Sequence, residues 1–142
     1  MKGSVFVDTN ILIYAHDCDA GLKHDLAVSL IAHLWESRSG VLSTQVLQEF
    51  YVNVTRKIMK PISAAQARGV IGNYLAWQVE HNEPETILLA SEIEERYQFS
   101  FWDALIVAAA SSARVERILT EDLQNGQVIE GILIENPFAA AI

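Results

Sequence analysis

Acidic side chains stand at several points of the chain where a predicted strand or helix begins or ends. Asp8 directly follows a short apolar run, Ser4–Val7, and precedes a helical pattern that begins at Ile11. A strand that ends in a carboxylate delivers it to the place where open α/β sheets bind ligands, outside the carboxyl ends of the strands. Helix capping would also explain Asp8, because Asp is among the residues favoured at a helix N-terminus.

Three further acids are candidates for the same chemistry, and each also has an ordinary structural explanation. Asp103 opens an apolar helical run and lies three residues after Ser100, which is the spacing of a capping box. Asp122 follows a later strand in a turn-rich run, where Asp is common. Glu49 falls at the edge of a helix's apolar stripe and would by itself be a solvated residue. Their joint occurrence is harder to dismiss, because strand ends and helix starts of a parallel sheet collect at one edge.

Carboxylates gathered at one sheet edge would repel one another strongly unless a cation lay between them. Hard oxygen ligands without His or Cys favour magnesium or manganese over zinc. Such an ion lowers the pKa of a bound water and stabilises charge on a phosphodiester, so the predicted chemistry is metal-assisted phosphodiester hydrolysis. A serine or cysteine triad is not indicated, since the histidines are dispersed and have no evident nucleophile partner. The histidines are His16, His24, His33 and His81.

The composition is that of one compact domain, predicted over residues 1–142. The longest apolar run, Ala104–Ala110, covers about a third of the roughly 20 residues that a membrane-spanning helix needs, which predicts a soluble protein with no membrane association. Cys18 is the single cysteine and cannot form an internal disulfide. Residues 1–3 lead directly into a short strand without a signal-peptide pattern, so we expect a cytoplasmic location.

The net charge of −8 argues against a protein that holds nucleic acid by a broad basic surface. It is compatible with a nucleic acid substrate, because cations recruited by an acidic pocket would meet the phosphates. An acidic surface that only maintains solubility would give the same composition. A local basic cluster consists of Arg56, Lys57, Lys60 and Arg68. Contact with an RNA backbone and compensation of a helix macrodipole would each explain this cluster.

The spacing of apolar residues predicts the elements that position these acids. Short apolar runs predict strands at residues 4–7, 41–43, 117–120 and 132–134. Helical spacing predicts helices at residues 11–15, from 26 to a stop at 39–40, 44–59, 63–79 with Ser63 as its cap, 84–97 and 103–110. The last helix is apolar on nearly every side and should lie in the middle of the domain. Strands that alternate with helices indicate a parallel sheet in a layered α/β domain.

Four motifs, taken in order along the chain, resemble the PIN-domain family of ribonucleases and in particular the VapC-type toxins. They are Val5-Phe-Val-Asp8-Thr-Asn-Ile11, the helical Glu49, Phe101-Trp-Asp103-Ala-Leu-Ile106 and Leu119-Thr-Glu-Asp122. The resemblance covers essentially the whole chain. It implies a PIN-like three-layer α/β/α domain with a central, mainly parallel sheet.

The same resemblance implies a magnesium- or manganese-dependent endoribonuclease that acts on single-stranded RNA. The catalytic and metal-binding residues carried over from it are Asp8, Glu49, Asp103 and Asp122, with Thr9, Asn10 and Thr120 in supporting polar roles. It also suggests a homodimer and, if the protein is a toxin, an antitoxin that blocks the site. Glu121 competes with Asp122 for the fourth place. Alternation along an extended segment favours Asp122, because it would face the same way as Thr120.

Two other functional classes remain open at the level of the sequence. A phosphotransferase of the haloacid-dehalogenase type also places a nucleophilic Asp at the end of its first strand. Such enzymes resemble Asp-x-Asp, whereas the second position here is Asn10. A catalytically inactive PIN-like module that binds RNA or protein would be favoured by loss of one of the acids. None of the four acids is missing.

Overall fold

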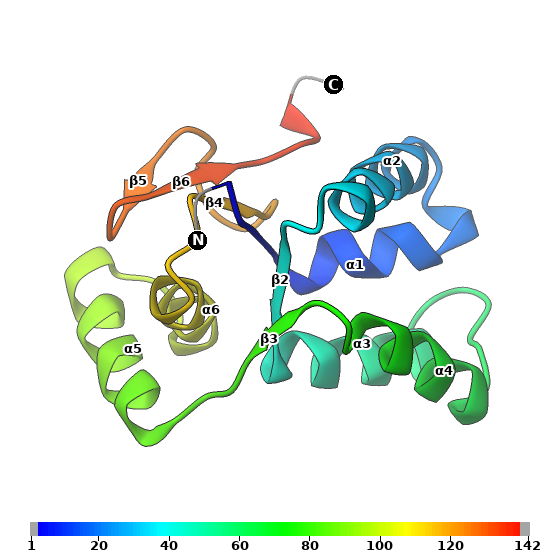
Figure 1. Ribbon diagram of the computed structural model, residues 1–142, viewed down its shortest axis with the longest axis horizontal. Coiled ribbons are helices and arrows are strands. Elements are labelled where there is room, and N and C mark those ends of the chain that lie inside the picture. Colours follow the sequence, from blue (N-terminus) through cyan, green and yellow to red (C-terminus); the bar gives the residue numbers. More distant parts are fainter. Residues whose placement is uncertain (1–2, 140–142) are drawn as a thin grey trace.

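The computed structural model describes residues 3–139, so the outermost residues of the predicted domain lie outside the described range. Strands and helices are interspersed along the chain, with two α-helices between successive parallel strands up to β4 (Figure 1). In order they are β1 (Val5–Val7), α1 (Thr9–His16), the 3₁₀ turn η1 (Cys18–Ala20), α2 (Leu22–Ser37), β2 (Gly40–Ser43), α3 (Thr44–Arg56), α4 (Ala64–Tyr74), β3 (Gln78–Glu80), α5 (Pro84–Tyr97), α6 (Phe101–Ser112), β4 (Arg117–Leu119), β5 (Val128–Ile129) and β6 (Ile132–Glu135).

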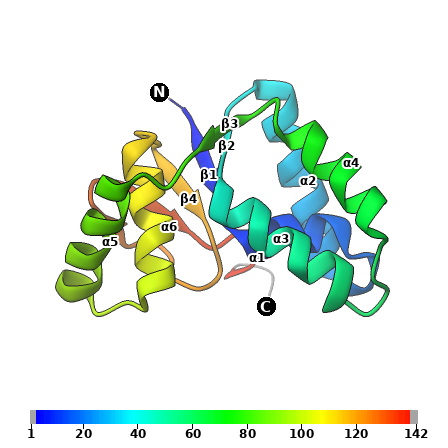
Figure 2. The same ribbon diagram turned by 90° about the horizontal axis from the view of Figure 1, so that it is seen from below.

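The strands form one six-stranded sheet in the order β3-β2-β1-β4-β6-β5. Every neighbouring pair is parallel except β5 and β6, which pair antiparallel. Helices α5 and α6 lie on one side of the strands, and α1 to α4 lie on the other (Figures 1 and 2). The predicted three-layer α/β/α domain with a mainly parallel central sheet is confirmed.

The core is built from the central strands and the helices that cover them. All three residues of β1 are buried, as are Ala104–Ala110 of α6, which confirms that this apolar helix is covered on all sides. A strand buried on both faces reads as a continuous apolar run, which is the pattern of residues 5–7. Among residues 3–139, no helix is long and apolar enough to cross a membrane.

The sequence prediction was wrong at both edges of the sheet, where it extended one helix too far and missed two strands. The helix predicted over residues 63–79 ends at Tyr74, and the strand β3 follows it at Gln78–Glu80. Val79 fits helical spacing, but its backbone pairs with Leu42 of β2. A three-residue edge strand has too little alternation to reveal itself in the sequence, and the two-residue β5 was missed for the same reason. Helix α3 also ends at Arg56, three residues earlier than predicted.

The register of the central strands brings the ends of β1 and β4 together. Val7 pairs with Leu119, and the Asp8 amide donates to the Leu119 carbonyl at 3.0 Å. Asp8 and Thr120 therefore leave the sheet side by side at its carboxyl edge. Helix α3 starts directly after β2, with Ser43 as its N-cap, so Glu49 approaches the same edge from the neighbouring strand.

Candidate active site

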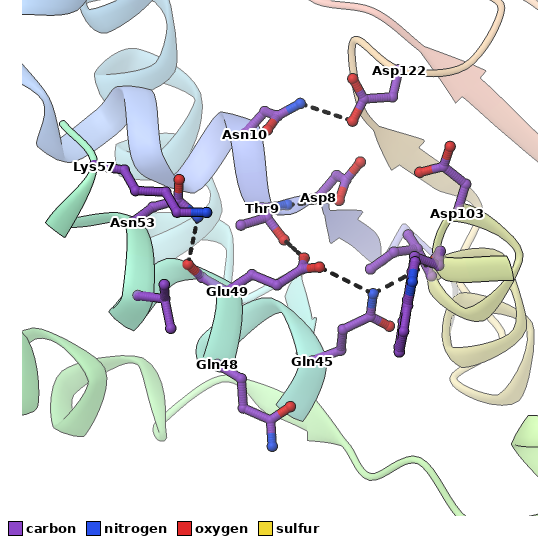
Figure 3. Close-up of a pocket in the computed structure, with 13 residues that line it drawn as sticks. Asp8, Thr9, Asn10, Gln45, Gln48, Glu49, Asn53, Lys57, Asp103 and Asp122 are labelled. Carbon is purple, nitrogen blue, oxygen red and sulfur yellow. Dashed lines mark hydrogen bonds between the residues drawn. The ribbon is translucent and has the colours of Figure 1, made fainter. Parts of the chain in front are cut away.

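The four predicted acids line one cavity of about 440 Å³ at the carboxyl edge of the sheet. Asp8 follows β1, Glu49 lies on α3, Asp103 is in the first turn of α6, and Asp122 follows β4. The carboxylates of Asp8, Asp103 and Asp122 turn toward one another, and Glu49 reaches toward them from α3 (Figure 3). Four segments that are far apart in the sequence thus deliver one carboxylate each to a single cavity.

Asp8 is the buried centre of this group, with 6% of its surface exposed. It is the N-cap of α1, where its Oδ1 accepts from the Thr9 amide at 2.7 Å. Its Oδ2 accepts from the Thr120 hydroxyl, also at 2.7 Å. The Asp8 carboxylate therefore caps α1 and also lines the cavity, so the two explanations offered for Asp8 do not exclude each other. The two hydrogen bonds fix its orientation.

The carboxylates influence one another electrostatically. Burial raises the pKa of Asp8 from 3.8 to about 7; the hydrogen bonds from Thr120 and Thr9 act in the opposite direction, and the charges of Asp122 and Glu49 add to the rise. Burial also raises the pKa of Asp122, with a further contribution from Asp103. Like charges that raise one another's pKa values are typical of acids that share a site.

Glu49 is held by neighbours on two sides. The Thr9 hydroxyl donates to its Oε1 at 2.6 Å, and the buried Gln45 amide lies 3.4 Å from its Oε2. The Asn53 amide donates to the Glu49 carbonyl at 2.8 Å. Gln45, Asn53 and Lys57 all line the cavity, and neither Gln45 nor Asn53 was predicted to belong to the site. A signal was present, because these residues and Glu49 recur every four positions along one helix face.

Asp122 and Glu121 point to different parts of the molecule. The Asn10 amide donates to Asp122 Oδ2 at 2.8 Å, and Asp122 lines the cavity. Glu121 instead accepts from the Tyr14 hydroxyl and from Lys23 Nζ, the latter at 2.8 Å. This is the orientation expected from alternation after β4. Asn10, which stands where a haloacid-dehalogenase enzyme has its second acid, is used here to hold Asp122.

Asp103 and Ser100 form the start of α6. The Ser100 hydroxyl accepts from the Asp103 amide at 3.1 Å and so caps the helix. The Asp103 side chain lines the cavity. Backbone and side chain therefore serve separate purposes: the amide completes the cap, and the carboxylate is left for the site.

The basic cluster and the histidines lie mostly outside the cavity. Lys57 alone among the described cations lines it, whereas Lys60 lies 4.0 Å from Asp19. Arg56 is in the last turn of α3, where a cation also offsets the helix macrodipole. His16 shares a hydrogen bond of 2.8 Å with the Tyr74 hydroxyl, and burial lowers the pKa of its imidazole. These contacts fit a structural role for His16.

The donor set fits a hard divalent cation in its chemistry. Four carboxylates and the amide of Asn10 offer only oxygen and amide ligands, which suit magnesium and manganese. No group of three or more His, Cys, Asp or Glu side chains within residues 3–139 is arranged closely enough to hold an ion as it stands. Hydrogen bonds from Thr9, Asn10 and Thr120 hold the carboxylates in this separated arrangement. Mutual repulsion favours the same separation, so side-chain adjustment would accompany metal binding.

Comparison with known proteins identifies the fold independently. A family model of the PIN domain matches residues 5–127. Similar solved structures include Mycobacterium tuberculosis VapC20, described as a Sarcin-Ricin loop cleaving toxin, with 22% identity, coverage of 84% of this chain and 90% of that chain, and a TM-score of 0.64. A toxin-antitoxin complex from Klebsiella pneumoniae gives 20% identity, coverage of 94% and 98%, and a TM-score of 0.68. DNA-bound VapBC from Salmonella typhimurium has 17% identity, coverage of 95% of this chain and 98% of that chain, and a TM-score of 0.66. A search of curated proteins gave no match.

Proposed function

The chain belongs to the PIN-domain family, and from this premise we propose that it is a magnesium- or manganese-dependent endoribonuclease of single-stranded RNA. The observation that carries the proposal is the convergence of Asp8, Glu49, Asp103 and Asp122 on one cavity. Each of the four acids comes from a separate element, and the fold by itself does not require them to meet in one cavity. Four acids in one cavity also argue against an inactive binding module, which would tolerate the loss of one.

The proposed roles follow from the contacts of each side chain. Asp8, Glu49, Asp103 and Asp122 would hold the cation, which when bound activates water and stabilises charge on the scissile phosphate. Thr9 and Thr120 orient the carboxylates of Glu49 and Asp8 by donating to them. Asn10 does the same for Asp122. Lys57 lines the side of the cavity opposite Asp103, where it is available to a neighbouring phosphate (Figure 3).

We also propose that the protein is the toxin of a toxin-antitoxin pair. Support comes from the similar structures, one of which is described as a cleaving toxin and another as a toxin-antitoxin complex. A protein partner that covered the cavity would keep the acids from RNA. The homodimer and the cytoplasmic location stay predictions from the sequence.

The metal requirement is the first test of this proposal. Purified protein should cleave a single-stranded RNA in magnesium or manganese and should be inactive in EDTA, because the site as proposed has no covalent nucleophile. Gel analysis of an end-labelled RNA measures this, and the same RNA annealed to its complement is the control for strand preference. Full activity in the chelator would rule out the metal site.

Asp122→Asn should lower the cleavage rate far more than Glu121→Gln. Asp122 lines the cavity, whereas Glu121 binds Tyr14 and Lys23 outside it. The loss at Asp122 should be milder than at Asp8, because Asp122 is more exposed and such a ligand can act through water. Rates at limiting and saturating manganese separate weakened metal binding from impaired chemistry. A larger effect of Glu121→Gln would reassign the fourth acid.

A further inference from the structure

Trp102 is an exposed aromatic residue at the start of an otherwise covered helix. The residue is 64% exposed, although Ala104–Ala110, which begin two residues further on, are buried. Single exposed apolar residues are common and need no explanation by themselves. Trp102, however, lines the same cavity as the four carboxylates and is the immediate neighbour of Asp103. Its position, rather than its exposure alone, points to a role at the site.

The backbone of Trp102 belongs to the first turn of α6, and its ring contacts one aromatic neighbour. The ring of Phe101 meets the Trp102 ring edge to face, with centroids 5.5 Å apart and an interplanar angle of 78°. The Gln45 amide lies 3.4 Å from the Trp102 carbonyl and 3.4 Å from Glu49. One buried amide therefore connects the aromatic wall of the cavity to one of its acids. A Trp side chain is rigid and has only two rotatable bonds, so it loses little conformational freedom when a planar ligand stacks on it.

The charge of the protein makes such a surface useful for RNA. The chain has a net charge of −8, and Lys57 is the one cation among the described residues that line the cavity. Few phosphates can be neutralised by side chains, so the usual electrostatic source of RNA affinity is weak here. Stacking of a base on an aromatic ring supplies affinity without positive charge and tolerates any base.

We propose that Trp102 is a stacking platform for one nucleobase of a single-stranded RNA, next to the phosphate that meets the carboxylates. The inference rests on the proposed ribonuclease activity and adds to it a residue that contacts the substrate. It would also explain the proposed preference for single-stranded RNA, because only an unpaired base can be splayed out onto a protein ring. The RNA backbone would continue from Trp102 past the acids toward Lys57.

The test is the affinity for a short, fluorescein-labelled single-stranded oligoribonucleotide, measured by fluorescence anisotropy. Binding is measured in calcium and cleavage in magnesium, so that the two are separated. Trp102→Ala should weaken binding roughly tenfold to hundredfold. Trp102→Phe should retain most of the affinity, and Trp102→Leu, which keeps apolar bulk without a ring, should not. Leu88→Ala removes an exposed apolar side chain outside the cavity lining and should leave binding unchanged.

A series of oligoribonucleotides with one base removed at each position completes the test. Loss of the stacked base should weaken binding to the wild type and should have no effect on Trp102→Ala. Equal penalties in both proteins, unchanged binding by Trp102→Ala, or no binding by the wild type would overturn the proposal. A change of oligomeric state in Trp102→Ala without a change in RNA affinity would overturn it as well, because the ring would then serve a protein interface.

The two proposals fail separately. If wild type and Trp102→Ala bind RNA equally and the wild type cleaves in magnesium, the stacking platform is wrong and the nuclease stands. If binding depends on the ring and no cleavage occurs, the platform stands and the nuclease is wrong. Melting curves of every variant check that each is folded.

Discussion

Asp8→Asn is expected to lower the rate of RNA cleavage by about a thousandfold or more, because removing the central ligand of the proposed metal site would cost several kcal/mol of transition-state stabilisation. Asp8 accepts two hydrogen bonds, from the Thr9 amide and the Thr120 hydroxyl. Asn keeps the size of the side chain and an oxygen for the capping bond. The loss should therefore be chemical and not structural.

Single-turnover cleavage of an end-labelled RNA measures this effect. Asp103→Asn should behave alike, because its amide, and not its carboxylate, completes the cap with Ser100. Asp25→Asn, an acidic position in α2 outside the cavity lining, is the matched control and should cleave normally. Near-normal activity in Asp8→Asn would remove Asp8 from the site.

Without divalent metal, the protein is expected to lose stability as the pH rises from about 4 to about 7. Burial raises the folded-state pKa of Asp8 from 3.8 to about 7. The stabilising contribution of the protonated carboxyl is complete at pH values below the pKa of the unfolded state, and it is lost as the pH rises through the pKa of the folded state. A shift of this size corresponds to about 4 kcal/mol at most. Asp8→Asn should remove this pH dependence and raise the melting temperature at neutral pH.

Magnesium should stabilise the wild type by binding the folded state, and should stabilise Asp8→Asn less. Thermal unfolding at several pH values, with and without magnesium, measures both effects. Sodium chloride at matched ionic strength is the control, since general screening also relieves repulsion. If wild type and Asp8→Asn show the same pH profile and the same response to magnesium, Asp8 neither has the raised pKa described above nor binds the metal.

Asp8, Asp103 and Asp122 could be found from the sequence because each lies near the start or end of a strongly patterned element, whereas Glu49, in the middle of α3, was assigned to the site only through the family resemblance. The apolar run of β1 ends at Asp8, and the apolar run of α6 begins after Asp103. Their meeting in one cavity follows from the parallel pairing of β1 with β2 and β4; the pattern of elements predicts a parallel sheet, and the order of its strands comes from the structure. Local patterns in the sequence were therefore enough to predict that Asp8, Asp103 and Asp122 lie at the carboxyl edge of the sheet.

The parts that could not be predicted depend on contacts between distant segments. The four-residue spacing places Gln45 on the helix face of Glu49, but only the approach of α6 to α3 brings its amide to both Glu49 and the Trp102 carbonyl. The edge strand β3 is specified by its pairing with β2 and not by its own three residues. In each case tertiary context outweighs the local pattern.

The origin of the oxygen added during cleavage tests the central claim most directly. Hydrolysis at the carboxylate site uses solvent water, whereas a nuclease without metal would use the ribose 2′-hydroxyl and leave a cyclic phosphate. Cleavage with manganese in water enriched in a heavy oxygen isotope, followed by mass spectrometry of the product ends, separates the two. The account predicts one heavy oxygen on a terminal phosphate at each cut in the first turnover. An unlabelled cyclic phosphate end would contradict it.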